Sequence, residues 1–488
     1  MKQVPTERPQ QRPKAKPKRL VFCFDGTWNQ LSVDNLTNVA LVAQMVRPVA
    51  ADGTPQLVYY DEGIGTGRKW LGKAIDGAFG RGMLRIMRDA YRFLIFNYDP
   101  GDEIFAFGFS RGAYTARSFI GLVRHAGIID IARASKIDQA IDIYRHAPAG
   151  TGKESPAGLR FRAQNSAKTC VSAADRDYRL KNVTGFTWSK DDKLLQFKYL
   201  GVWDTVSALG VPGFIRFSAL FNQKYAFHNA VLTGKIQYAR HAVAIDEPRK
   251  AFRPTLFGRD NVARYNARNQ RTGAPPIPEW KLHYQEKWFP GVHSAVGGGG
   301  VRRGLSDGAL QWILAGAIDA GLDLRNDGSD VMYAIKPDPY DLVVIDPRKV
   351  AAAAGQFGWL KSWLNGPRDG PVALDEVALP TLRRWRAEPL RLREERQYRP
   401  ATLGKVAQLI DQANLASALE FKSAHPVFDW YVLRRGDTLS KLALSRLGSG
   451  KLWHEIFELN RDLIDNPDQV PIGLPIRLPI PQSAPASP

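Results

Sequence analysis

The sequence predicts an α/β fold in which a mostly parallel sheet carries helices on both faces, and three observations lead to this prediction. Short apolar runs alternate along the chain with segments whose apolar residues recur at helical spacing. These runs are apolar along most of their length, as is typical of parallel strands that are buried on both faces. Several of them end at Asp or Gly residues, which commonly mark the ends of strands.

The elements follow one another in the order that crossover connections require. A strand that is followed by a helix and a further strand forms a parallel pair, because the helix carries the chain back across the sheet. The first strand ends at the turn Asp25-Gly26-Thr27, and the second is followed by a glycine-rich loop at 63–67. The predicted strands are Arg19–Phe24, Gln56–Tyr60, Glu103–Phe107 and Phe197–Trp203, and the predicted helices are Met83–Phe96 and Ala113–Ala126.

Changes in composition divide the 488 residues into successive regions, and this length predicts two or three units. The alternating strands and helices occupy residues 18–345, with two insertions at about 132–190 and 208–290, the second of which we expect to act as a cap. A basic, partly ordered connector is expected at 346–428. We expect the basic, Pro/Gln-rich leader at 1–17 and the Pro/Ser-rich tail at 481–488 to be disordered.

The overall composition, with 44% apolar and 24% charged residues, is ordinary for a globular protein. No run approaches the roughly 20 apolar residues that a membrane-spanning helix needs. The leader has no apolar segment after its basic residues, so we do not interpret it as a Sec-type signal peptide. Export, if it occurs, is therefore expected to follow a non-Sec route.

The formal net charge of +20 predicts attraction to polyanions such as nucleic acid, anionic lipid headgroups or acidic cell-wall polymer. The sequence has no zinc-finger, helix-turn-helix or aromatic ribonucleoprotein signature, so we do not predict nucleic-acid binding. Its two cysteines, Cys23 and Cys170, form no metal-binding motif. We predict no metal and no cofactor.

The pentapeptide Gly108-Phe109-Ser110-Arg111-Gly112 joins a predicted strand to a predicted helix. In a Gly-x-Ser-x-Gly turn the serine adopts strained dihedrals and stands above the sheet edge, so the neighbouring positions must be almost free of side-chain bulk. The helix N-terminus and the amide of the residue after the serine then stabilise negative charge. We therefore predict that Ser110 is the nucleophile of a serine hydrolase and that the Arg111 amide is an oxyanion donor.

A serine hydroxyl needs a general base and an acid that orients the base. In sheets of this type the acid and then the histidine follow the serine along the chain. His293 is favoured among the eight histidines because an aromatic, apolar segment leads to it and the glycine run 297–300 follows. Asp204 is favoured as the acid because it ends a predicted strand, but spacing alone leaves Asp246 and Asp307 as alternatives.

Two further features stay open on sequence alone. The turn Asp25-Gly26-Thr27 ends a strand at the same sheet edge, so the Gly26 amide is a candidate for the second oxyanion donor, and a simple capping turn is the alternative. His241 lies in an apolar stretch that we interpret as a helix face, where a structural role is expected.

Six stretches of the chain carry a more specific signal. They are Phe22–Asn29, Tyr59–Thr66, Gly108–Arg117, Gly201–Val206, Arg240–Glu247 and Trp288–Ser294. In this order, over about residues 18–325, they resemble the catalytic domain of the type VI secretion phospholipase effectors of the first lipase-effector family. The resemblance implies an α/β-hydrolase-like fold and hydrolysis of phospholipid acyl esters. It also implies that Ser110 is the nucleophile, Asp204 the acid and His293 the general base.

The chain departs from this family at one position next to the base. The family usually carries an aspartate two residues after the histidine, and that position is Ala295 here. If that aspartate were the orienting acid, this protein would be impaired. If it only supports the loop, catalysis through Asp204 survives, and we favour this second interpretation.

The last part of the chain, at 429–480, reads as a small strand–helix–helix–strand unit. It resembles a lysin-motif (LysM) domain, which implies binding of peptidoglycan or another N-acetylglucosamine-containing glycan in a shallow groove, with a scaffolding role as the alternative. The residues that carry the resemblance include Tyr431, Trp453, Ile456, Asn460 and Ile476–Pro479. By resemblance the groove would be built from Gly436, Asp437, Thr438, Leu439, Asn466, Pro467 and Asp468.

Our first hypothesis for function is a two-domain lipolytic enzyme that acts on phospholipid while its LysM-like unit holds it at the cell wall. As a type VI effector it would reach the periplasm of a target cell and have secretion-apparatus and immunity proteins as partners. The second hypothesis is a non-catalytic cell-wall-anchoring or secretion-apparatus scaffold on a hydrolase fold, which Ala295 and the missing signal peptide favour. The third is an esterase or thioesterase for small cytoplasmic substrates.

Overall fold

The structure is a computed structural model, and the residues that it describes fall into several ranges. They are 17–26, 35–63, 75–148, 154–190, 192–206, 232–270, 277, 279–325, 335–342, 365–392, 396–413, 428–434, 436–460, 464, 466–472 and 474–479. The predicted leader and tail lie outside them, apart from residue 17.

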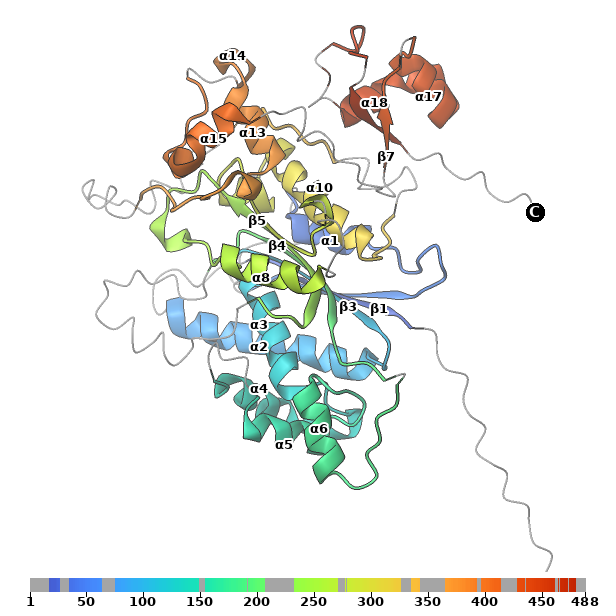
Figure 1. Ribbon diagram of the computed structural model, residues 1–488, viewed down its shortest axis with the longest axis vertical. Coiled ribbons are helices and arrows are strands. Elements are labelled where there is room, and N and C mark those ends of the chain that lie inside the picture. Colours follow the sequence, from blue (N-terminus) through green and yellow to red (C-terminus); the bar gives the residue numbers. More distant parts are fainter. Residues whose placement is uncertain are drawn as a thin grey trace, which may run out of the picture.

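A parallel sheet of six strands forms the centre of the molecule, in the order β2-β1-β3-β4-β5-β6 (Figure 1). The strands are β1 (Arg19–Phe24), β2 (Gln56–Asp61), β3 (Glu103–Phe109), β4 (Phe197–Trp203), β5 (Ile236–Ala244) and β6 (Tyr284–Phe289). All four predicted strands are present. The stretch around His241 belongs to β5, so its interpretation as a helix face is wrong. Apolar periodicity does not distinguish a fully buried strand from a buried helix, and this stretch is buried between β4 and β6.

Helices cover both faces of the sheet, as the sequence predicts. Alternate side chains of β1 point to opposite faces, because the side-chain repeat of a strand is two residues. Phe22 and Phe24 belong to the core beneath α2 and α3, whereas Val21 and Cys23 belong to the core beneath α1 and α10. These helices are α1 (Asn38–Met45), α2 (Ile75–Asn97), α3 (Arg111–Ala126) and α10 (Gly304–Asp319).

The two predicted insertions differ in nature. The described residues of the first insertion, 131–148 and 154–182, form a helical extension that packs on α2 and α3. It consists of η1 (Ile131–Lys136), α4 (Ile137–Arg145), α5 (Pro156–Asn165) and α6 (Ala173–Asn182). The region 208–290 is not a single cap, because β5 and β6 lie within it, together with η2 (Lys250–Phe252), α8 (Arg259–Asn269) and η3 (Glu279–Lys281). Residues 207–231 and 271–276 of this region lie outside the described residues.

The described residues of the segment 365–413, which are 365–392 and 396–413, pack against the sheet, although we expected them to be part of a basic connector. Val377 pairs with Trp288 of β6 in a parallel bridge, and Trp385 and Leu403 share a hydrophobic core with Val243 and Trp288. The elements of the segment are η5 (Leu374–Glu376), α13 (Leu379–Arg386), α14 (Pro389–Leu392), η6 (Ala401–Val406) and α15 (Ala407–Gln412).

Arginine composition alone did not reveal this packing. Arg384, one of the clustered arginines, is fully buried and donates to the carbonyls of Pro339 and Asp341 at 3.0 and 2.7 Å. Backbone acceptors of this kind allow a guanidinium to enter a core that composition would assign to solvent.

The C-terminal unit has the predicted strand–helix–helix–strand order and a hydrophobic core of its own. Its antiparallel strands are β7 (Phe428–Val432) and β8 (Pro475–Pro479), and its helices are α17 (Leu439–Leu447), η7 (Gly450–Leu452) and α18 (Trp453–Leu459). The side chain of Thr438 caps α17 by accepting a hydrogen bond from the Lys441 amide.

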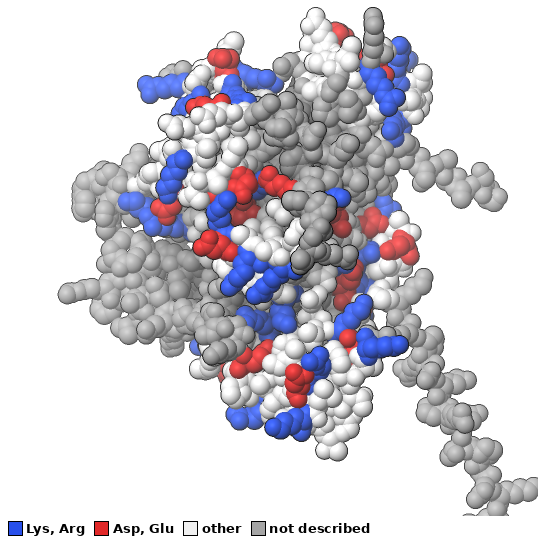
Figure 2. All heavy atoms as spheres, in the orientation of Figure 1, with Lys and Arg blue, Asp and Glu red and all other residues white. Residues whose placement is uncertain are grey.

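Charge and hydropathy add two observations about the described residues. None of their helices has the length and apolar character needed to cross a bilayer. On the face drawn in Figure 2, lysine and arginine side chains alternate with acidic ones over the described surface rather than forming one patch.

Candidate active site

The predicted site residues follow three strands at the carboxyl edge of the parallel sheet. Ser110 follows β3 and Asp204 follows β4, whose last residues, Phe109 and Trp203, are paired in register. His293 begins the short helix α9 (His293–Gly297), four residues after β6. Ligands and catalytic groups gather at this edge in open α/β sheets, because loops from neighbouring strands meet there.

Ser110 has the backbone that the turn predicts. Its φ of 60° and ψ of −124° lie in a region that non-glycine residues rarely adopt. Its amide donates to the Trp203 carbonyl at 3.0 Å, which ties the turn to β4. Gly112 has no room for a side chain, because a Cβ there would lie 2.2 Å from the Phe24 carbonyl oxygen. Close packing on β1 therefore helps to hold the strained serine.

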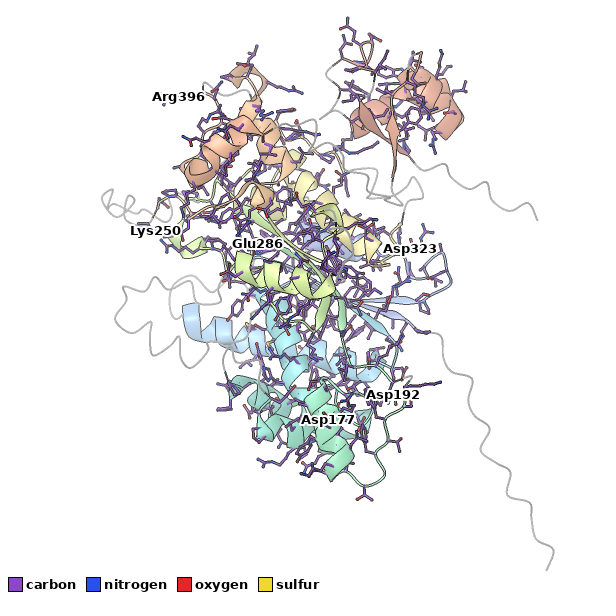
Figure 3. The ribbon with its side chains drawn as sticks, viewed as in Figure 1. Asp177, Asp192, Lys250, Glu286, Asp323 and Arg396 are labelled. Atoms are coloured by element: carbon purple, nitrogen blue, oxygen red, sulfur yellow. The ribbon has the colours of Figure 1, made fainter. Side chains whose placement is uncertain are left out.

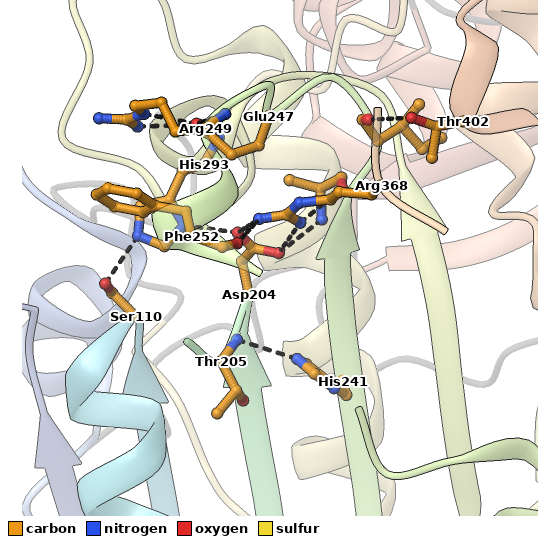
Figure 4. A network of polar contacts seen from close by, with 12 residues as sticks. Ser110, Asp204, Thr205, His241, Glu247, Arg249, Phe252, His293, Arg368 and Thr402 are labelled. Atoms are coloured by element: carbon orange, nitrogen blue, oxygen red, sulfur yellow. Dashed lines mark hydrogen bonds and ion pairs between the residues drawn. The ribbon is translucent and has the colours of Figure 1, made fainter. Parts of the chain in front are cut away.

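His293 connects the other two residues (Figure 4). Its Nε2 lies 2.7 Å from Ser110 Oγ, and its Nδ1 lies 2.5 Å from Asp204 Oδ2. The imidazole lies between two aromatic rings, with centroid distances of 4.7 Å to Phe109 and 4.9 Å to Phe252. With its Nδ1 proton directed at the carboxylate, Nε2 is left to accept the serine proton.

Asp204 is fully buried and carries a charge that the surroundings stabilise. Burial raises the pKa of its carboxyl, but the guanidinium of Arg368 and the hydrogen bond from His293 together hold that pKa well below its usual range. The Ala244 amide donates to Oδ1 at 2.9 Å. Asp204 has a φ of 38°, so the acid, like the serine, sits on a strained turn.

A second carboxylate supports the base from its backbone side. Glu247 Oε2 accepts the His293 amide at 3.2 Å, and Glu247 is paired with Arg249 at 2.5 Å. Burial raises the pKa of Glu247, whereas the hydrogen bond and charge of Arg249 lower it, and the net direction is downward. Arg249 stacks on Phe252, one of the rings beside His293, at 3.8 Å.

The alternative acids have other partners. Asp246 accepts hydrogen bonds from the Gly291 amide and the Tyr398 hydroxyl, at 2.6 and 2.8 Å. Asp307 pairs with Arg303 at 3.0 Å. In this structure only Asp204 of the three is hydrogen-bonded to His293 among the described residues.

His241 has the structural surroundings that the sequence analysis expected, although on a strand. Its Nε2 accepts the Thr205 amide at 3.1 Å, and its Nδ1 lies 2.8 Å from Glu286. Glu286 is on β6, inside the fold beside α8, where Figure 3 labels it. This buried pair fixes the residue that follows Asp204.

The backbone amides of the two predicted oxyanion donors, Arg111 and Gly26, have different surroundings. Arg111 is the first residue of α3, so its amide is at the N-terminus of the helix that follows the serine. The Gly26 amide instead donates to its neighbour's carboxylate, at 2.6 Å from Asp25 Oδ1. Asp25 also accepts the hydroxyls of Thr37 and Tyr60, at 2.5 and 2.9 Å. Gly26 would have to exchange this partner to bind an oxyanion, and Thr27, the next residue of the turn, lies outside the described residues.

Sequence reasoning missed Arg368. Its guanidinium donates to both oxygens of Asp204, at 2.6 Å to Oδ1 and 2.9 Å to Oδ2. It also donates to the carbonyls of Ala244 and Phe252, at 2.7 and 2.6 Å. No sequence signal identified this arginine, because it lies 164 residues from Asp204 in a region whose arginines suggested only a basic connector.

The residues predicted to bind glycan lie on two loops of the C-terminal unit. Asp437 accepts the Tyr431 hydroxyl at 2.8 Å and the Arg434 amide at 2.7 Å, so its carboxylate shapes its own loop. Leu439 is 2% exposed and packs in the core, so only its backbone can face a ligand. Gly436 precedes Asp437, Thr438 caps α17, Asn466 accepts the Asp468 amide at 3.0 Å, and Pro467 is half-buried between them.

Among the described residues, no group of three or more His, Cys, Asp or Glu side chains is arranged to hold a metal ion.

A family model for the catalytic domain of Tle1-like phospholipase effectors of the type VI secretion system matches residues 18–316. An uncharacterized protein of Saccharomyces cerevisiae is 24% identical over an alignment of 253 residues that covers 49% of this chain and 33% of that protein. Among solved structures, an uncharacterized protein from Pseudomonas aeruginosa is similar at 18% identity and a TM-score of 0.32, covering 64% of this chain and 47% of its own. A Tle1 effector bound to the VgrG spike of the type VI secretion system is similar at 19% identity and a TM-score of 0.31, covering 59% and 51%. The chain thus spans about a third of the curated relative and about half of each solved chain.

Proposed function

Because this chain belongs to the family of Tle1-like phospholipase effectors, we propose that it is a serine hydrolase that cleaves acyl esters of phospholipids. The observation that carries the proposal is the contact of His293 with both Ser110 and Asp204, at 2.7 and 2.5 Å. A serine, a histidine and a carboxylate in this order form the arrangement that activates a hydroxyl nucleophile on many folds.

The chemistry follows from these contacts. His293 Nε2 takes the proton of Ser110, and Oγ forms a bond to the acyl carbon of the ester. Negative charge then develops on the carbonyl oxygen, where the Arg111 amide and the N-terminus of α3 stabilise it. The tetrahedral intermediate expels the alcohol part of the lipid, which receives the proton from His293. Water, deprotonated by the same imidazole, releases the fatty acid and restores Ser110.

Asp204 has a supporting role in these steps. Its carboxylate holds the imidazole in the tautomer that leaves Nε2 free to accept a proton, and it stabilises the imidazolium that forms. The contact of His293 with Asp204 supports the interpretation that catalysis survives with Ala295 at the position next to the base.

The hydrolysis of phospholipid vesicles by purified protein tests the proposal. We expect fatty-acid release by the wild type, loss of release in Ser110→Ala, and unchanged release in Ser118→Ala, a buried serine on α3, the helix that follows Ser110. Equal rates in the wild type and Ser110→Ala would remove Ser110 from the mechanism. A wild type that cleaves only short soluble esters would support the small-substrate esterase.

We further propose that the C-terminal unit is a LysM-like module that binds peptidoglycan. Its βααβ order and separate core support this assignment. Sedimentation of the full chain with purified peptidoglycan tests it, with Asn466→Ala as the loop variant and Leu444→Ser, an exposed residue of α17, as the control. Failure of the wild type to sediment would favour a scaffolding role for this unit.

The proposed route and partners follow from the family. As an effector of the type VI system, the protein would pass through the secretion apparatus into the periplasm of a target cell and would meet an immunity protein in its own lineage. Comparison of culture supernatants from cells with an intact and an inactivated type VI apparatus tests the route. Equal export from both would overturn it.

A further inference from the structure

Arg368 neutralises the carboxylate that faces the base. Its side chain is 2% exposed, that of Asp204 is 0% exposed, and the two form an ion pair with N–O distances of 2.6 and 2.9 Å. A guanidinium stays charged at any accessible pH, and its planar fork matches the two oxygens of a carboxylate. Asp204 therefore faces His293 with its charge already paired.

The second carboxylate in contact with His293, that of Glu247, is also paired with an arginine. Among the described residues, the ionisable groups hydrogen-bonded to His293 are Asp204, at its ring, and Glu247, at its amide. Glu247 carries Arg249 as Asp204 carries Arg368. A buried carboxylate without such a partner favours protonation of a neighbouring imidazole, whereas a paired carboxylate does so less.

The position of Arg368 is fixed by the backbone on either side of it. The Gly366 amide donates to the Pro248 carbonyl at 2.8 Å, two residues before the arginine. Two residues after it, Gly370 has a φ of 72° and approaches Thr402 so closely that a Cβ would lie 1.8 Å from the Thr402 carbonyl oxygen. Thr402 in turn donates to the Ile245 carbonyl at 3.0 Å. The segment 365–413 is thus docked on the loop that follows β5, beside the base.

We propose that Arg368 is a positioning residue that holds both oxygens of Asp204 and offsets their charge, so that Asp204 keeps its orientation toward His293 and favours the imidazolium less than an unpaired carboxylate would. The proposal rests on the hydrolase function proposed above. It also extends the catalytic unit beyond residues 18–316, the part of the chain that matches the family model.

The test compares substitutions that remove or keep the charge of Arg368 with a control substitution at a second buried arginine. Arg368→Gln removes the charge, and Arg368→Lys keeps it on a group with fewer hydrogen bonds. Arg384→Gln removes a second buried arginine of the same segment, which donates to the carbonyls of Pro339 and Asp341 and lies over the Tyr398 ring. The profile of kcat/KM against pH is measured for a short acyl ester, with thermal unfolding to confirm that each variant folds.

We expect Arg368→Gln to lower kcat/KM at neutral pH by about 100-fold through lost orientation. We also expect its acidic limb to move up by about one pH unit, because the unpaired carboxylate favours the imidazolium. Arg368→Lys should show a smaller movement in the same direction, and Arg384→Gln none. If Arg368→Gln folds and the acidic limb of its kcat/KM profile lies at the same pH as in the wild type, the proposal is overturned. If Arg368→Gln does not fold, an unmoved limb in Arg368→Lys would do the same.

A second readout separates this proposal from the proposed function. The ring resonances of ¹³C-labelled histidine report the protonation of His293 without substrate, with His293→Gln used for assignment. A titration midpoint of the His293 resonances that is about one pH unit higher in Arg368→Gln than in the wild type supports the role of Arg368. This holds even if the wild type hydrolyses no lipid. An unchanged midpoint overturns it even if the wild type is an active lipase.

Discussion

The two sides of the site are held by different forces. The nucleophile side depends on steric fit, since Ser110 has strained dihedrals and Gly112 packs against the backbone of β1. The acid side depends on buried charge, since Asp204 and Glu247 each pair with an arginine around His293. The nucleophile turn is local in sequence, whereas Asp204 and Arg368 are 164 residues apart.

This difference teaches what each side contributes to catalysis. A steric device fixes geometry equally at every pH, because no proton is gained or lost. Paired charges also depend on pH, because each ion pair stabilises the ionised form of its carboxylate. Substitutions on the two sides should therefore leave different signatures.

The largest effect is expected for the acid itself. Asp204→Asn removes the charge, presents the wrong hydrogen-bonding group to Nδ1 of His293 and leaves Arg368 buried without its carboxylate. We expect kcat to fall by about 10⁴-fold, the loss known when a triad aspartate of this kind becomes an amide. Steady-state hydrolysis of a short acyl ester measures it, and a loss below tenfold in a folded variant would mean that another group orients the base.

On the steric side, Gly112→Ala places a methyl group 2.2 Å from the Phe24 carbonyl oxygen. We expect the free energy of unfolding to fall by about 3 kcal/mol, because either the turn or β1 must move. Urea unfolding at pH 7 and pH 5 measures the change. It should be the same at both values, and a loss confined to one pH would contradict a steric cause.

Low pH should reduce stability through the buried carboxylates Asp204 and Glu247. The pKa values of Asp204 and Glu247 are lowered in the folded protein, so each contributes stability that is present above its unfolded pKa, about 4, and is lost as the pH falls through its folded value. We therefore expect unfolding free energy to decline below about pH 4. Replacing Arg368 by Gln removes the partner that lowers the Asp204 pKa, so the part of this decline that Asp204 contributes should become smaller. An identical pH dependence in both proteins would show that this pair is not linked to folding.

The smallest effect is expected for Glu247→Gln, which should move activity in the direction opposite to Arg368→Gln. The substitution removes a negative charge beside the His293 amide and leaves Arg249 in place, so the imidazolium is favoured less. We expect the acidic limb of kcat/KM to move down by about half a pH unit. Movement to higher pH would show that Glu247 acts by a route other than its charge.

The sequence predicted the local features of the site and missed the long-range ones. The strand, the pentapeptide and the following helix are contiguous, so the position of Ser110 followed from the chain itself. Asp204 and His293 required a resemblance to settle what spacing left open among Asp204, Asp246 and Asp307. Arg368 was not predicted, because its role arises from packing of the 365–413 segment on β5 and β6.

The fold shows the same limit. Four strands and the helices on both faces followed from apolar runs and helical spacing, whereas β5 was taken for a helix because a fully buried strand has no alternation. The region expected to be a basic connector shows a related limit. Arginines such as Arg384 are satisfied by backbone carbonyls inside the core, and composition cannot report such partners.

The central claim, that Ser110 is a nucleophile activated by His293, is tested most directly by labelling the full chain with a fluorophosphonate and locating the adduct by peptide mass spectrometry. The account predicts a single adduct at Ser110 in the wild type, no adduct in Ser110→Ala, and labelling of His293→Gln that is slower by about 10³-fold or more. Labelling of Ser110 at the same rate with and without His293, or no labelling of the folded wild type, would contradict it.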